Sequence, residues 1–425
     1  MHTGEVKKGV PQKVLRYFPI IPRLKRMFRS EKVAADLRSH FNNKSTDGKL
    51  RHPVDSVTWK SMNDKYPTFA AEKRNLRLGL STDGFNPFNM KNSRYNSWPV
   101  LLVNYNMAPD LCMKEENIML SLLIPGPDQP CNSIDVYLEP LVEDLNHLWS
   151  KGKITYDAFS KTTFTLRAML LWTISDFPAY GNLVGCKVKG KMGCPICGKH
   201  TDSLWLSDSR KHVYMCHRKS LSPLHSFRGK KSWFDGKAEH GTKGRILTGR
   251  NNSLLLRKYE NDFVNRKETG KKRSRAACDI PSDNEDEYSA SNDVEENLAE
   301  KDEEELSRWK KRSIFFTLPY WEDGLKARKD LEILGIKKYL HPKAHGRDAR
   351  LAGHVNFRWM YLFERYMKVL KDYVKNPAKP EGCIAESYLA EERMKLCFDF
   401  LKTTTNVEEK EERNTDVSTR SVTRP

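Results

Sequence analysis

The chain has 425 residues, and its 74 Lys and Arg against 55 Asp and Glu give a formal net charge of +19 at pH 7. This length allows two or three domains, but hydrophobic residues make up only 38%, so part of the chain is expected to lie outside any core. No apolar run approaches the roughly 18 residues of a membrane span, and the first residues lack the apolar segment of a signal peptide, so we expect neither a membrane protein nor a secreted one. The charge favours a polyanionic partner, most simply nucleic acid.

The nine cysteines are an odd number and are widely scattered. Disulfide-stapled domains carry an even number at regular spacings, so a disulfide framework is not expected. Six of the nine read as isolated residues: Cys112, Cys131, Cys186, Cys278, Cys383 and Cys397.

Residues 1–70 form a basic N-terminal region. Eight Lys and Arg and a single acid, Glu5, lie between Met1 and Ser30, and apolar residues such as Phe18 and Leu24 interleave with the arginines. One interpretation is a helix or loop with a solvated basic face. The other is an arm on the DNA backbone, which the one-sided charge slightly favours.

Residues 71–185 are the most core-like part of the chain. An amphipathic helix is predicted at Ser133–Trp149, because its apolar residues recur at steps of four and three, and Asn132 is the predicted N-cap, with Asp135 favourable in the first turn. Strands are predicted at apolar runs bounded by turn residues, namely Asn75–Thr82, Trp98–Met107, Asn117–Ile124 and Ala168–Ser175. The order is therefore strand, strand, strand, helix, strand.

Two aspartates follow the first and fourth of these strands. Asp83 comes directly after Asn75–Thr82, and Asp176 directly after Ala168–Ser175. In an RNase-H-like nuclease core these two strands are adjacent and parallel, so both carboxylates would face the same pair of Mg²⁺ ions, about 3.5–4 Å apart. The alternative is that each aspartate only forms a turn at a strand end.

A Cys/His cluster follows the core at residues 186–240. Cys194 and Cys197 form a CxxC motif, and Cys216, His217 and His225 stand downstream. Two thiolates and two imidazoles suit a closed structural Zn²⁺ site, with Cys194, Cys197, His217 and His225 as ligands and Cys216 as a replacement for His217. The alternative is a reduced cysteine pair with surface histidines, and a thioredoxin-like role is less favoured because the βαβ setting is absent.

The remaining chain alternates between charged and apolar segments. A basic cluster at Lys271–Arg275 precedes an acidic tract, a composition typical of a disordered linker, and the cluster reads either as a nuclear localisation signal or as a solvated charge run. Two helices are predicted beyond it, at Asn356–Val374 and Ile384–Leu401.

Over the aspartates, the Cys/His cluster and several longer stretches, the chain resembles the transposases of plant CACTA (En/Spm-type) DNA transposons. The resemblance is dense over residues 2–236 and continues in pieces over 311–340. The matching stretches include LRYFPIIPRLKRMF, RLGLSTDGFNPF, WPVLLVNYNMAPDLCMK, MLSLLIPGPDQPCNSIDVYLEPLVEDL, LLWTISDFPAYGNLVG, KGKMGCPICGK, HRKSLSPLHSFR and KRSIFFTLPYWED. The later stretch FRWMYLFERYMKVLKDYVKNPAKPEGCIAESYLAEE resembles a domain of unknown function that accompanies these enzymes.

The resemblance implies a DDE/D recombinase that cuts transposon ends and joins them to a target with Mg²⁺ or Mn²⁺. Asp83 and Asp176 match the first and second acids of the family pattern, and Cys194, Cys197, His217 and His225 match a Cys/His insertion before the third. It implies DNA as partner, specifically transposon terminal repeats, with full-length transposase as a second expected partner, and a nuclear location.

This sequence departs from the family where the third acid should stand. The family continues LPYW with a helix that bears a glutamate, whereas here Trp321 leads through Glu322 and Asp323 straight into Leu325. Neither acid, nor Glu332 beyond them, stands in the family context. We therefore expect an α/β chain divided into a basic region at 1–70, an RNase-H-like core at 71–185, a Cys/His zinc-type insertion at 186–240, a disordered charged linker at 241–310, the end of the transposase domain at 311–345, a truncated helical domain at 346–402 and a disordered tail at 403–425.

Three functions follow from the sequence. The first, which we favour, is a DNA-binding protein whose transposase chemistry is lost with the third acid, since a two-metal site needs all its ligands. The second is an active transposase in which another acid, or a partner copy, fills the third place. The third is a non-enzymatic interaction protein whose zinc module and acidic tract bind other proteins.

Overall fold

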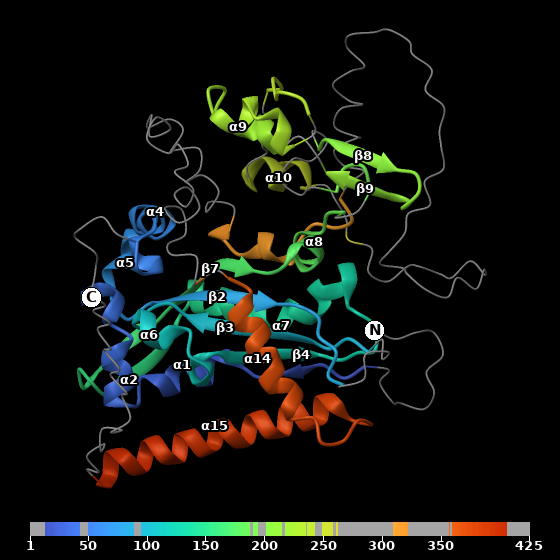
Figure 1. The fold of residues 1–425 in the computed structure, drawn as a ribbon. Coiled ribbons are helices and arrows are strands. Elements are labelled where there is room, and N and C mark those ends of the chain that lie inside the picture. Colours follow the sequence, from blue (N-terminus) through green and yellow to red (C-terminus); the bar gives the residue numbers. More distant parts are fainter. Residues whose placement is uncertain are drawn as a thin grey trace, which may run out of the picture.

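The computed structural model describes residues 13–42, 50–88, 95–187, 190–193, 201–214, 217–234, 236–242, 249–257, 261, 309–321, 357 and 359–405. It is a mixed α/β fold built around one sheet (Figure 1). Short 3-10 turns separate some of the elements, which are β1 (Arg16–Tyr17), α1 (Ile20–Met27), α2 (Glu31–Asp36), α3 (Ser39–Asn42), α4 (Val57–Lys65), α5 (Pro67–Ala71), β2 (Leu76–Thr82), β3 (Trp98–Asn104), α6 (Pro109–Cys112), β4 (Met119–Ile124), α7 (Ile134–Ser150), β5 (Lys153–Asp157), β6 (Thr162–Leu166), β7 (Ala168–Ile174), α8 (Phe177–Val184), β8 (Ser203–Leu206), β9 (Lys211–Tyr214), α9 (Ser226–Gly229), α10 (Gly249–Leu255), α14 (Tyr361–Asp372) and α15 (Pro380–Thr405).

The central sheet has five strands in the order β1-β4-β3-β2-β7. β2 pairs in parallel with β7 and antiparallel with β3, and β3 pairs antiparallel with β4. This confirms that the first and fourth predicted strands are adjacent and parallel. A parallel pair needs a crossover connection, and β3, β4 and α7 provide it.

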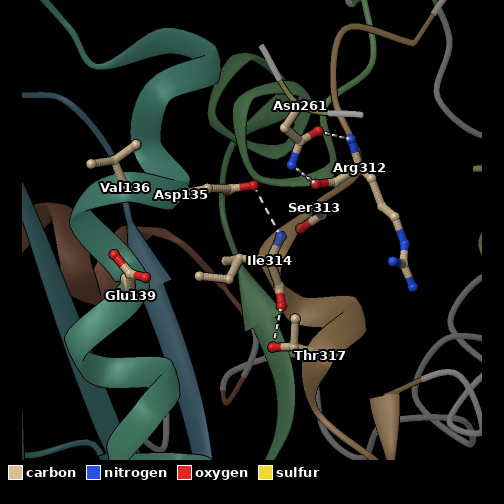
Figure 2. Close-up of a pocket in the computed structure, with 8 residues that line it drawn as sticks. All are labelled: Asp135, Val136, Glu139, Asn261, Arg312, Ser313, Ile314 and Thr317. Atoms are coloured by element: carbon tan, nitrogen blue, oxygen red, sulfur yellow. Dashed lines mark hydrogen bonds between the residues drawn. The ribbon is translucent and has the colours of Figure 1, made fainter. Parts of the chain in front are cut away.

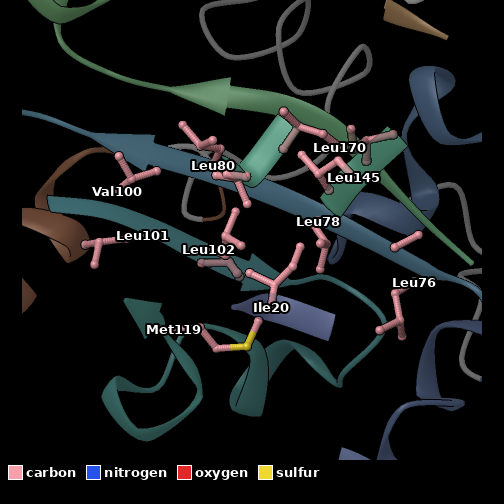
Figure 3. Close-up of a cluster of buried hydrophobic side chains, with 14 of the residues drawn as sticks. Ile20, Leu76, Leu78, Leu80, Val100, Leu101, Leu102, Met119, Leu145 and Leu170 are labelled. Carbon is pink, nitrogen blue, oxygen red and sulfur yellow. The ribbon is translucent and has the colours of Figure 1, made fainter. Parts of the chain in front are cut away.

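Every residue of β2, β3 and β4 is buried. Figure 3 shows the leucines of β2 packed with residues of β3, α1 and α7, so apolar side chains fill the space around the sheet. The Leu alternation in β2 therefore marks one face of a strand that is covered on both sides. Its second face holds Arg77, Gly79 and Ser81, and a Cβ on Gly79 would lie 2.5 Å from the ring of Tyr105.

The long amphipathic helix is confirmed as α7, one residue later than predicted at each end. The predicted N-cap is wrong: Ser133 occupies the cap, and its side chain makes no capping hydrogen bond. Asp135 does lie in the first turn, but its carboxylate binds Lys311 and the amide of Ile314. A long-range partner therefore takes the acid that the sequence assigned to the helix end.

The hairpin of β5 and β6 was not predicted from the sequence. Its residues alternate between exposed and buried, and the hairpin lies between α7 and β7 in the chain. Buried Asp157 at its turn accepts hydrogen bonds from Ser160 and lies within 3.4 Å of Arg74. The hairpin thus leaves the strand order of the central sheet unchanged.

The basic N-terminal region is built into the fold over its described residues. β1 extends the sheet beside β4, and Phe18, Ile20 and Leu24 are buried in the core. Arg23 is buried too, and it donates to Glu392 at 2.7 Å and to the carbonyl of Leu120 at 2.7 Å. Phe18, Ile20 and Leu24, which interleave with the arginines in and just before α1, are therefore core residues.

Both predicted C-terminal helices are confirmed, as α14 and α15, and both pack on the core rather than standing apart. Figure 1 shows α14 crossing the sheet and α15 running along it. Glu381 of α15 is 5% exposed and accepts hydrogen bonds from Ser97 and Tyr95 near the start of β3. Within the described ranges, no helix is long and apolar enough to cross a membrane.

The cysteines partly follow the sequence expectation. Cys112, Cys186, Cys383 and Cys397 are not disulfide-bonded. Cys131 is disulfide-bonded, so its expected isolation is wrong. Most of the predicted linker, including Lys271–Arg275, lies outside the described residues, as do Glu322, Asp323, Glu332 and the tail beyond residue 405.

Candidate functional site

Asp83 and Asp176 lie side by side at the carboxyl ends of β2 and β7. Ser81 and Ile174 are paired in the parallel register, and each aspartate follows two residues later. Successive residues of extended chain point to opposite sides, so Asp83 leaves the strand on the same side as Ser81. The sequence correctly predicted that the fold brings these two acids together.

Each aspartate uses one oxygen to hold its own chain. Oδ1 of Asp83 accepts a 2.7 Å hydrogen bond from the amide of Gly84, and Oδ1 of Asp176 accepts one of 2.8 Å from Ala179, which caps α8. The turn-forming alternative is therefore part of the local structure. It engages one oxygen of each carboxylate, and no described residue donates a hydrogen bond to either Oδ2.

The environment of Asp83 disfavours its ionised form. Burial, together with the nearby charge of Asp176, raises the pKa of Asp83 to about 6, although the Gly84 hydrogen bond acts in the opposite direction. The cost of ionising two neighbouring acids in a half-buried place is what a bound cation would relieve. The pair therefore has the chemistry of a cation site.

A third acid, Glu364 of α14, comes close to this pair, and its charge also raises the pKa of Asp83. Met360 is the N-cap residue of α14, and its Sδ lies 3.3 Å from Oγ of Ser81, two residues before Asp83. Glu364 lies one helical turn beyond Met360, on the same face, because its amide binds the Met360 carbonyl. The neighbouring helix thus directs an exposed carboxylate towards the end of β2.

Glu364 was not predicted as a site residue, although its sequence context carries a signal. Met360, Phe363 and Met367 form an apolar stripe at steps of three and four, and Glu364 occupies the position in that stripe that an apolar residue normally takes. A charged residue at the edge of a buried apolar stripe indicates either a charged partner or a functional site. The sequence does not show which other acid Glu364 lies near, because that depends on tertiary packing.

The residues present suit a divalent cation in their chemistry. Carboxylate oxygens are the ligands that Mg²⁺ and Mn²⁺ prefer, and Asp83 and Asp176 would hold such an ion. It would stabilise negative charge on an attacking or leaving oxygen. No three His, Cys, Asp or Glu side chains within the described ranges are grouped tightly enough to hold a metal ion.

Replacing Asp83 is expected to change stability in a pH-dependent way. The pKa of Asp83 is raised from 3.8 to about 6 in the folded chain, so ionisation destabilises the fold as pH rises through this window. Asp83→Asn should therefore raise the free energy of unfolding by about 1 kcal/mol at pH 7.5, after allowance for solvent screening, and by little below pH 4. Urea unfolding at both pH values measures the difference.

The same experiment tests the neighbouring charges. Glu364→Gln removes one charge that raises the pKa of Asp83, so it should give a smaller gain with the same pH dependence. Millimolar Mn²⁺ should stabilise the wild type at pH 7.5 and leave Asp83→Asn unchanged. An equal effect of Asp83→Asn at both pH values would contradict this account.

The predicted zinc ligands are only partly visible. Cys194, Cys197 and Cys216 lie outside the described residues, and so does the side chain of His217. His225 caps α9, and its Nδ1 accepts a 3.2 Å hydrogen bond from the amide of Phe227. A neutral imidazole that accepts at Nδ1 carries its proton on Nε2, so zinc ligation by His225 requires this cap to be released.

A cavity of about 270 Å³ lies at the start of α7, away from the aspartate pair. Figure 2 shows its lining, with Asp135 and Glu139 on one side and the segment that contains Arg312 and Ile314 on the other. Asn261 donates to and accepts from the backbone of Arg312. None of the site residues predicted from the sequence lines it.

Comparisons with known proteins agree with the resemblance at a coarse level. Residues 47–257 match the profile described as Transposase family tnp2, and this range contains both aspartates. Residues 337–415 match the domain of unknown function DUF4218, and this range contains Glu364 and Glu381. No curated protein matches the chain. The chain therefore contains a region similar to the tnp2 transposase family, followed by a region similar to DUF4218.

Proposed function

We propose that this protein binds DNA and that the cleavage chemistry of CACTA (En/Spm-type) transposases has been lost from it. The observation that carries the proposal is the match of residues 47–257 to a transposase family in a chain of net charge +19. Transposases act on DNA, and a strongly basic chain gains affinity for the phosphate backbone by releasing counterions. The expected DNA is the terminal repeat of a transposon.

The proposed core is RNase-H-like, with Asp83 and Asp176 as its first two acids. Their position at the ends of adjacent parallel strands supports this assignment. The proposed loss of activity rests on the sequence after Trp321, which lacks the glutamate-bearing helix of the family. A two-metal site without its third acid loses much of its stabilisation of the transition state.

Glu364 favours a second candidate, an active Mg²⁺-dependent transposase. Its carboxylate is near enough to raise the pKa of Asp83, and α14 is held to β2 through Met360 and Ser81. A modest movement of α14 on binding DNA would let Glu364 serve as the third acid. The candidate therefore assigns a catalytic role to a residue of the DUF4218 region.

One set of assays separates the two candidates. Fluorescence anisotropy with a labelled terminal-repeat duplex should show binding that weakens steeply with salt, by about a thousandfold between 50 and 200 mM for about six phosphate contacts. Asp83→Asn should leave this binding unchanged. With Mg²⁺ or Mn²⁺, no nicking of the duplex is expected, with or without full-length transposase.

The possible outcomes are distinct. Nicking that both Asp83→Asn and Glu364→Gln abolish would replace the first candidate with the second. Nicking that only the aspartate variants abolish would place the third acid elsewhere. Little or no salt-sensitive binding to any DNA would contradict both candidates and favour a protein-interaction role.

A structural zinc ion and a nuclear location complete the proposal. Cys194, Cys197, His217 and His225 would hold the ion, with Cys216 as the alternative to His217. Metal analysis of the purified chain should give about one zinc per molecule, and much less for Cys194→Ser. Lys271–Arg275 would direct the chain to the nucleus, and a fluorescent fusion without these residues should remain outside it.

A further inference from the structure

Residues 217–242 carry exposed aromatic rings among lysines. Trp233 is 67% exposed, and Phe227 and Phe234 are also exposed. Exposed aromatic groups of this size usually mark an interaction surface, since burying them on a partner is favourable. Figure 1 shows α9, which belongs to this segment, in a lobe with β8, β9 and α10, above α8 and the sheet.

The Lys230 side chain lies directly against two of these rings. Nζ of Lys230 is 4.0 Å from the ring centroid of Trp233 and 5.1 Å from that of Phe227. The rings of Phe227 and Trp233 have their centroids 5.8 Å apart. The three side chains, which we call the aromatic–lysine cluster, leave much of the Trp233 ring open to solvent.

The backbone that carries the cluster is held by hydrogen bonds from two buried arginines. Arg218 and Arg228 are buried, and their guanidinium groups donate to backbone carbonyls, Arg218 to that of Lys237 at 3.0 Å and Arg228 to that of Lys219 at 2.9 Å. The Arg218 guanidinium also lies 4.3 Å from the ring centroid of Phe234. Backbone ties of this kind hold the rings in place before any partner binds.

The charge of this segment indicates the chemistry of the partner. Between residues 217 and 242 there are six Lys and Arg and only two acids, Asp235 and Glu239. Oε1 of Glu239 accepts a 2.8 Å hydrogen bond from the amide of Gly241. A partner that brings both flat apolar rings and negative charge suits this surface, and unpaired nucleotides bring both.

We propose that the aromatic–lysine cluster binds unpaired bases of DNA, with Trp233 stacking on a base and Lys230 beside the phosphates. The inference rests on the proposed DNA binding and specifies the strand form that this lobe contacts. Base stacking on an aromatic side chain is worth about 1–3 kcal/mol per base, or roughly 5- to 150-fold in affinity. Paired bases in a blunt duplex offer no such stacking surface, except at the ends.

The test compares two labelled probes of the same sequence, a blunt duplex and one with an eight-nucleotide single-stranded extension. The full chain should bind the extended probe more tightly, and Trp233→Ala should weaken that binding about tenfold while changing binding of the blunt duplex by less than twofold. Trp233→Phe should restore most of the loss. Trp205→Ala, which removes another exposed tryptophan in the same lobe, should have little effect.

Each other result overturns the inference in a recognisable way. Equal affinity for both probes, or equal losses in Trp233→Ala and Trp205→Ala, would show that the cluster does not read unpaired bases. Displacement of the extended probe by polyglutamate, with Trp233-dependent binding of the polyglutamate itself, would assign the cluster to an acidic protein partner. Absence of binding to either probe would contradict the proposed DNA binding itself.

Discussion

Lys311→Met is expected to lower the free energy of unfolding by about 3–5 kcal/mol, because it leaves the buried carboxylate of Asp135 without its partner. Nζ of Lys311 lies 2.5 Å from Oδ1 of Asp135, and the two side chains are 1% and 4% exposed. Burial raises the pKa of Asp135 and lowers that of Lys311, and their mutual attraction opposes both shifts. Urea or thermal unfolding monitored by circular dichroism measures the loss.

Two variants make this prediction specific. Lys151→Met removes an exposed lysine from the other end of α7 and should change stability by less than about 0.5 kcal/mol. The double variant Asp135→Leu with Lys311→Met replaces the pair by apolar groups and should recover much of the loss. A Lys311→Met chain that unfolds like the wild type would mean that the ion pair does not hold the fold.

The ion pair of Asp135 and Lys311 affects the candidate site because it fixes the chain segment that contacts α8. The amide of Lys310 donates to the carbonyl of Gly185 at 2.7 Å, and Gly185 ends α8 with a φ of 87°. Asp176 caps the other end of the same helix. The segment around Lys311 therefore holds the C-terminal end of α8, and Asp176 lies at the N-terminal end of the same helix.

The sequence predicted the part of the fold that depends on local pattern. Apolar runs bounded by turns identified three buried strands and β7, and their order implied that Asp83 and Asp176 would meet. It could not predict the hairpin of β5 and β6, whose alternation is short and partly exposed. Nor could it identify β1, a two-residue strand beside β4 that is too short to show a periodic pattern.

Long-range polar contacts could not be predicted from the sequence, for a different reason. Asp135 looked like a residue that only favours a helix start, because its partner Lys311 is 176 residues away in the chain. The proximity of Glu364 to Asp83 likewise depends on how α14 packs beside β2. A pattern fixes which face of a helix is apolar, whereas the pairing of charges depends on how distant elements pack.

Glu381→Ala is expected to loosen α14 and α15 from the core and to lower the free energy of unfolding by about 3 kcal/mol, because it leaves three donors without their acceptor. The carboxylate accepts hydrogen bonds from Oγ of Ser97 at 2.6 Å, from the hydroxyl of Tyr95 at 3.0 Å and from the amide of Gly126 at 3.2 Å. Each donor left buried without a partner costs about 1–3 kcal/mol, and local relaxation recovers part of this. Equilibrium unfolding measures the total.

Hydrogen exchange identifies the part of the fold that Glu381→Ala destabilises. Protection in Pro380–Thr405 should fall in Glu381→Ala before it falls in β2, because α15 is anchored at this glutamate. Glu386→Ala, which removes an exposed glutamate one turn further along α15, should leave both stability and protection unchanged. Unchanged protection of α15 in Glu381→Ala would mean that other contacts, such as Arg23 with Glu392, are sufficient to dock it.

The same glutamate connects the DUF4218 region to the aspartate pair through two short steps. Ser97, which donates to Glu381, forms a β-bridge with Phe85, and their backbone amides and carbonyls exchange two 2.9 Å hydrogen bonds. Phe85 lies two residues beyond Asp83 in the same loop. Glu381→Ala should therefore also free this loop, bring the pKa of Asp83 back towards 3.8, and remove most of the pH-dependent stability gain that Asp83→Asn produces. If Asp83→Asn gave the same stability gain in the Glu381→Ala background as in the wild type, the docking of α15 would have no influence on the aspartate pair.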